Sequence, residues 1–167
     1  MNQLDMSTPL GITLGLLLEI LLTGWSLIVL LVASWRHETP ADSRLAGWLS
    51  FAGVVLSSAG LGWLWVNDVG PLGLAQMIAL DPFRYAGLAL VLLSAGATIL
   101  MSLGYLERER LLAPEYYPLI LLATSGMMFL AGSEDLTVQF LGLEVMSVAV
   151  YVLAGYNTPT HRRPKRR

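Results

Sequence analysis

The chain has 167 residues, of which 55% are hydrophobic and 13% charged, and its formal net charge is −2. Its mean hydropathy is +0.64, a composition that indicates a polytopic membrane protein and excludes a soluble globular domain. The absence of cysteine excludes a disulfide framework, a thiolate metal site and a cysteine nucleophile.

Apolar segments follow one another along the chain, each bounded by charged residues or proline. Their lengths predict about five transmembrane helices in a single membrane domain. The predicted spans are 10–35, 45–66, 83–106, 116–131 and 136–156, followed by a basic tail at 157–167. Sustained alternation of polar and apolar residues is missing, so we expect an all-α bundle, in which each helix satisfies its own backbone groups in lipid.

The first and third segments contain charged residues whose roles the sequence leaves open. Glu19 either marks the outer end of the first helix, at the membrane interface, or is an internal acid linked to proton transfer. Asp81 and Arg84 stand three residues apart at the start of the third segment and share a helix face, so they could form a structural pair.

Small residues and one tryptophan give weaker signals. Trp25 lies in the middle of the first segment and fits an interfacial aromatic belt poorly. Small residues four positions apart, such as Gly53 with Ser57 and Ser94 with Thr98, favour close helix contacts. We interpret these pairs as packing positions without chemistry.

Glu144 is the strongest functional candidate. It is the only charged residue between Leu136 and Tyr156. A carboxylate near the middle of a spanning helix must face protein or water, because bare charge in hydrocarbon is unfavourable. Desolvation also disfavours the charged form of a buried carboxyl group. The main hypothesis is therefore a membrane-embedded acid that loads and releases a proton, and the alternative is a structural acid hydrogen-bonded between helices.

Several polar side chains are predicted neighbours of this acid. Ser147 and Tyr151 lie on the same helical stripe and carry hydroxyls that could hydrogen-bond the carboxyl group or hold water. Gln139 extends the polar face, and Thr124 and Ser125 on the preceding segment could face it. A transmembrane proton route also needs a partner, commonly a buried lysine or histidine, and the predicted spans contain no lysine.

The distribution of basic residues predicts the orientation in the membrane. Nine basic residues fall on one side and only Arg84 on the other. By the positive-inside rule, the N-terminus faces the periplasm and the C-terminus the cytoplasm. The nine are Arg36, Arg44, Arg108, Arg110, Arg162, Arg163, Lys165, Arg166 and Arg167. We interpret the basic tail as a topology signal, and not as a site for nucleic acid.

The stretch YYPLILLATSGMMFLAGSEDLTVQFLGLEVMSVAVYVLAGY, residues 116–156, resembles the fourth and fifth helices of the subunit N family of bacterial NADH–quinone oxidoreductase, respiratory complex I. LGLEVMS, residues 141–147, is its most specific part. DPFRYAG at 81–87 and LLLEILLTG at 16–24 are similar to the openings of the family's third and first helices. The latter similarity favours the interfacial interpretation of Glu19.

The resemblance implies an antiporter-like membrane subunit related to Mrp-type cation/proton antiporters, with Glu144 carrying over the family's proton-path glutamate. The family's lysines on later helices, its broken helices and its second repeat have no positions in this sequence. We therefore expect the N-terminal part of such a subunit, as a fragment, a truncated product or half of a split subunit.

The implied function is proton translocation coupled to electron transfer from NADH to quinone, within the bacterial inner membrane. The chain itself is expected to bind no cofactor and no metal, with NAD and quinone used by the whole complex. Its implied partners are other membrane-arm subunits and the lipid bilayer. The alternatives are an inert or assembly fragment, or a subunit of an Mrp-type antiporter or of a membrane-bound hydrogenase.

Overall fold

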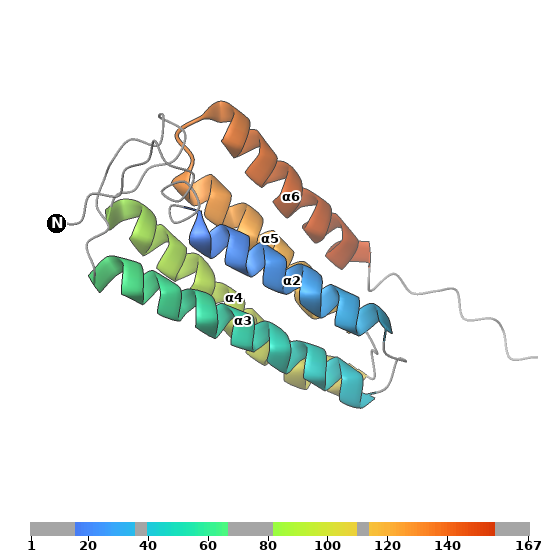
Figure 1. Ribbon diagram of the computed structural model, residues 1–167. Coiled ribbons are helices and arrows are strands. Elements are labelled where there is room, and N and C mark those ends of the chain that lie inside the picture. Colours follow the sequence, from blue (N-terminus) through green and yellow to red (C-terminus); the bar gives the residue numbers. More distant parts are fainter. Residues whose placement is uncertain (1–15, 36–39, 67–81, 110–113, 156–167) are drawn as a thin grey trace, which may run out of the picture.

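The computed structural model describes residues 16–35, 40–66, 82–109 and 114–155 of the chain (Figure 1). These residues form only helices and their connections, which confirms the predicted all-α fold. The helices are α2 (Leu17–Trp35), α3 (Pro40–Val66), α4 (Pro82–Glu109), α5 (Tyr116–Gly132) and α6 (Leu136–Gly155). The predicted start of the first span at residue 10, the basic tail and Asp81 lie outside the described residues.

Local sequence signals explain where several helices begin and end. Pro82 opens α4, where its fixed φ suits the first helical turn and its missing N–H is not needed. α5 ends where Ser133 adopts an extended conformation. The Asp135 carboxylate then accepts a hydrogen bond of 2.8 Å from the Thr137 N–H, which satisfies a donor at the start of α6.

Four of the helices are long and apolar enough to cross a membrane. They are α2, the Asp42–Val66 part of α3, the Pro82–Leu106 part of α4, and α6. α5 has 17 residues, which corresponds to a length of about 25 Å. This set of helices indicates a multi-pass membrane protein.

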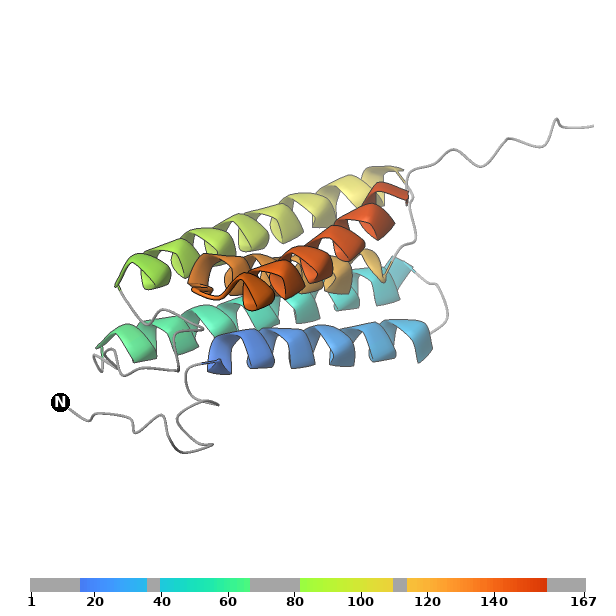
Figure 2. The same cartoon turned by 90° about the horizontal axis from the view of Figure 1, so that it is seen from above.

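α5 occupies the centre of the helix arrangement. It contacts α2, α3, α4 and α6, and the two perpendicular views agree that it lies among the other helices (Figures 1 and 2). Ten of its 17 residues are buried. A helix that is apolar all round is typical of such a position, because it meets protein on most of its surface.

α6 lies on the outside of this bundle. Among the described helices it packs only on α5, and only Gly142 and Ala149 of its 20 residues are buried. Figure 1 shows α6 running along one side of α5, away from α3 and α4. The position of α6 is therefore set by a single helix contact.

Trp25 joins α2 to α3 in the interior. Its indole Nε1 donates a hydrogen bond of 2.8 Å to the carbonyl oxygen of Leu49. A Cβ placed on Gly53 would lie 2.3 Å from the Trp25 ring, so this position has room only for glycine. The mid-segment tryptophan is thus a packing residue. Ser94 and Thr98, by contrast, are exposed and donate hydrogen bonds to carbonyls of their own helix, so they form no close contact with the other described helices.

Candidate functional site

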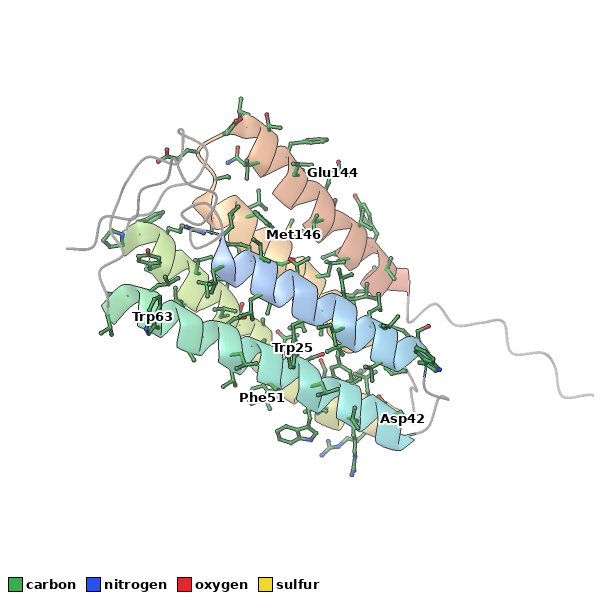
Figure 3. The ribbon with its side chains drawn as sticks, viewed as in Figure 1. Trp25, Asp42, Phe51, Trp63, Glu144 and Met146 are labelled. Carbon is green, nitrogen blue, oxygen red and sulfur yellow. The ribbon has the colours of Figure 1, made fainter. Side chains whose placement is uncertain are left out.

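Glu144 lies near the middle of α6, and its side chain is exposed. Met146, two residues later, packs toward α5, and two helical positions are about 200° apart around the axis. Figure 3 shows Met146 between α6 and α5, and Glu144 on the other side of α6. The carboxyl group therefore points away from the bundle, on a helix long and apolar enough to span a membrane.

The predicted polar neighbours on α6 lie near Glu144 along the helix but do not bind its carboxyl group. The Ser147 hydroxyl donates to the backbone carbonyl of Glu144 at 3.1 Å. Tyr151 is 74% exposed, and Gln139 is exposed as well. Together these side chains and Glu144 give the outward part of α6 a polar character within an otherwise apolar helix.

Thr124 and Ser125 occupy a different environment. Both are fully buried on α5. Thr124 Oγ1 donates to the Ile120 carbonyl at 2.7 Å, and Ser125 Oγ donates to the Leu122 carbonyl at 2.8 Å. Within the described part of the chain, no hydrogen bond links either hydroxyl to the Glu144 carboxyl group. Their role beside Glu144 stays a prediction.

The orientation of Glu144 follows from a close crossing of α5 and α6. A Cβ on Gly126 would lie 2.7 Å from the backbone nitrogen of Met146 and 2.8 Å from the carbonyl oxygen of Gly142. A Cβ on Gly142 would lie 3.0 Å from both the Gly126 oxygen and the Phe129 Cβ. The two backbones touch at these glycines, as small residues allow in membrane helices. With Gly142 turned toward α5, Glu144 is turned away.

The sequence pattern did not predict this crossing. The search for small residues four positions apart finds pairs within one helix, whereas Gly126 and Gly142 are single glycines on different helices. They become a pair only when the two helices dock. In the sequence Gly126 follows Thr124 and Ser125, and Gly142 stands between two leucines, so neither neighbourhood predicts a contact partner.

A second charged site lies at another place in the bundle. The Arg84 guanidinium on α4 binds Glu19 on α2, with 2.5 Å between Nη2 and Oε1. The side chains are only 2% and 1% exposed, respectively. Glu19 is in the first turn of α2, at a helix end as the interfacial interpretation required, but it is buried in protein. The predicted partner of Arg84 was Asp81, which lies outside the described residues.

No family model matches the chain, but curated relatives do. NADH-quinone oxidoreductase subunit N 2 of Roseiflexus castenholzii is 36% identical over 136 residues, which cover 81% of this chain. Subunit N 1 of Herpetosiphon aurantiacus is 35% identical over 161 residues, or 95% of this chain. Subunit N of Chloroflexus aggregans is 38% identical over 135 residues, or 81%.

These matches cover most of this chain but a smaller part of each relative. The chain spans 26%, 31% and 27% of the lengths of the three proteins, respectively. The resemblance predicted from residues 116–156 is confirmed by relatives that match well beyond that stretch. Over most of its length, this chain is similar to NADH-quinone oxidoreductase subunit N.

Proposed function

We propose that the chain is a membrane-arm subunit, or part of one, in a proton-translocating NADH–quinone oxidoreductase, and that Glu144 carries protons in it. The observation that carries this proposal is the single carboxyl group near the middle of α6, in a chain similar to subunit N. An ionisable group inside a membrane span is a functional-site candidate by default. Placing it in hydrocarbon is unfavourable, so such residues are rare and usually serve a function.

The exposed position of Glu144 leads us to expect a further segment at the site. In a membrane, the outward face of α6 would place a carboxyl group against lipid, which is unfavourable. We expect another segment to cover this face, either from the part of subunit N that the relatives have in addition or from a neighbouring subunit. A cation on that segment would stabilise the carboxylate, and its withdrawal would favour protonation. Such a cycle would load and release one proton.

In this proposal, the electron-transfer steps take place in other subunits of the complex. NAD and quinone bind elsewhere, and the chain acts through its membrane helices without a cofactor of its own. Its partners are other membrane-arm subunits and the lipid of the bacterial inner membrane. The names of the relatives favour this complex over an Mrp-type antiporter or a membrane-bound hydrogenase.

Assembly into the complex is tested in the native host. We would tag the chain at its C-terminus, solubilise the membranes, and run a native gel stained for NADH oxidation. The proposal expects the tag to migrate with a large NADH-oxidising band. The second candidate is an inert or assembly piece, which the same gel tests. Absence from the active band, or rapid degradation of the tagged chain, would favour the inert piece.

The role of Glu144 is tested by Glu144→Gln in the assembled complex. Glutamine keeps the shape but cannot exchange a proton, so we expect fewer protons translocated per NADH oxidised, measured in sealed membrane vesicles. Glu134→Gln is the matched control, because Glu134 is exposed just before α6 begins. Unchanged proton translocation in Glu144→Gln would refute the proposed role.

A further inference from the structure

The Glu19–Arg84 ion pair connects helices that have little other contact. Glu19 lies in the first turn of α2 and Arg84 near the start of α4. The backbones of α2 and α4 make no close approach to each other, whereas both pack on α5. The side chains meet in the interior, almost without exposed surface. This pair therefore bridges two helices across the end of a third.

That third helix provides the space for the pair at Gly132, the last residue of α5. A Cβ on Gly132 would lie 2.4 Å from Arg84 Nε and 2.9 Å from Arg84 Cδ. Such distances are too short for any side chain, so the arginine lies directly against the α5 backbone. The ion pair consequently fixes the position of the C-terminal end of α5 relative to α2 and α4.

The end of α5 leads directly to the helix that carries Glu144. Only residues 133–135 separate Gly132 from the start of α6. α6 packs on α5 alone among the described helices, so any displacement at this end of α5 is passed on to α6. We infer that the Glu19–Arg84 pair, seated on Gly132, is a positioning element that sets the placement of α6 and of its carboxyl group. This inference adds to the proposed function, because its value to proton transfer rests on the role of Glu144.

The physical basis is the asymmetry of buried ion pairs. Removing one partner leaves an uncompensated charge in an environment of low dielectric, which is strongly unfavourable. Replacing both partners by well-packed hydrophobic residues of similar volume is often neutral or stabilising. The pair should therefore respond to substitution as a unit. Loss of either charge should move the helices apart or let water in, whereas loss of both charges should not.

The experiment measures the distance from α3 to α6 in the full chain, reconstituted in lipid nanodiscs. The chain has no cysteine, so introduced cysteines alone carry spin labels. Val55→Cys on α3 and Val148→Cys on α6 are suitable, since these side chains are 51% and 54% exposed. Dipolar electron paramagnetic resonance then reports the distribution of distances between the two helices.

We expect Glu19→Leu and Arg84→Met each to shift or broaden this distribution, and the Glu19→Leu/Arg84→Met double variant to restore it. Arg108→Met is the matched control, because Arg108 is an exposed arginine in the last turn of the same helix. Unshifted distributions in both single variants would overturn the inference. A double variant as disturbed as the single ones would overturn it too.

Gly132→Ala provides an independent test if the single charge variants do not accumulate. Its methyl group would displace Arg84 while leaving both charges in the chain, and we expect a shifted distribution. Gly104→Ala, which adds a methyl group with nothing within 4 Å, should leave the distribution unchanged. An unshifted distribution in Gly132→Ala would contradict the inference. These distances are measured without proton transfer, so the outcome is independent of whether Glu144 carries protons.

Discussion

At the scale of single residues, the hydroxyl and indole groups of these apolar helices donate hydrogen bonds to two kinds of backbone acceptor. Most of the hydroxyls donate to a carbonyl of their own helix, as Thr124 and Ser125 do. Ser26 and Trp25 instead donate to the backbones of other helices. Only this second kind can hold helices together, because a bond within one helix is equally available when the helices separate.

The contribution of Ser26 can be measured by Ser26→Ala. Its hydroxyl donates a hydrogen bond of 2.8 Å to the Pro118 carbonyl oxygen, and this bond joins α2 to α5 in the interior. We expect the free energy of unfolding to fall by roughly 0.6 kcal/mol, and by at most about 1.7 kcal/mol, as for other bonds between membrane helices. Chemical denaturation in detergent micelles would measure the change.

Ser94→Ala is the matched control for this prediction. Ser94 is exposed and donates within α4, to the Val91 carbonyl. Its removal should therefore leave the free energy of unfolding almost unchanged. Equal losses in Ser26→Ala and Ser94→Ala would show that the bond between α2 and α5 contributes nothing specific.

At the scale of helices, the contact between α5 and α6 depends on two glycines. Backbone atoms of α6 leave no space for a Cβ on Gly126, and a Cβ on Gly142 would make a tight contact at 3.0 Å with the Gly126 oxygen. This close approach is the only contact through which the described helices hold α6. The rotation of α6, and with it the outward direction of Glu144, is therefore decided at this crossing.

Gly126→Val tests the crossing. The added side chain would meet the backbone of α6, and overpacking of this kind costs about 1–3 kcal/mol. We expect a lower free energy of unfolding, measured by denaturation in detergent micelles. Gly62→Val on α3 is the control, because a Cβ there has nothing within 4 Å and the change in helix propensity is the same. If Gly62→Val lowered the free energy of unfolding by as much, the effect of Gly126→Val would come from helix propensity and not from the crossing.

At the scale of the whole molecule, four helices form a bundle and α6 lies beside it. The bundle interior contains the buried ion pair and a continuous apolar core. The outer face of α6 contains Glu144 together with large exposed hydrophobic side chains, including Phe140, Val148 and Tyr151. In a membrane this combination of an acid and apolar groups is expected at a contact with another protein segment.

The orientation in the membrane is a prediction at this scale. With nine basic residues on one side and only Arg84 on the other, we expect a periplasmic N-terminus and a cytoplasmic C-terminus. A C-terminal fusion to green fluorescent protein should be fluorescent, and a fusion to alkaline phosphatase should be inactive. The opposite pair of results would contradict the predicted orientation.

The sequence by itself determined the class of the protein, its helical fold and the acid most worth testing. These features follow from local properties: the length of an apolar run, the charge or proline that bounds it, and the isolation of Glu144 in such a run. The family resemblance came from a continuous stretch, which needs no knowledge of the fold.

Only the tertiary structure decided which residues meet. Arg84 binds Glu19, 65 positions away in the chain. Gly126 and Gly142 meet across two helices, and Glu144 is turned outward while Thr124 and Ser125 are turned inward. The physical reason is that apolar membrane helices have almost uniform surfaces, so their rotation and neighbours depend on close packing and on a few polar contacts. A single helix considered alone does not contain that information.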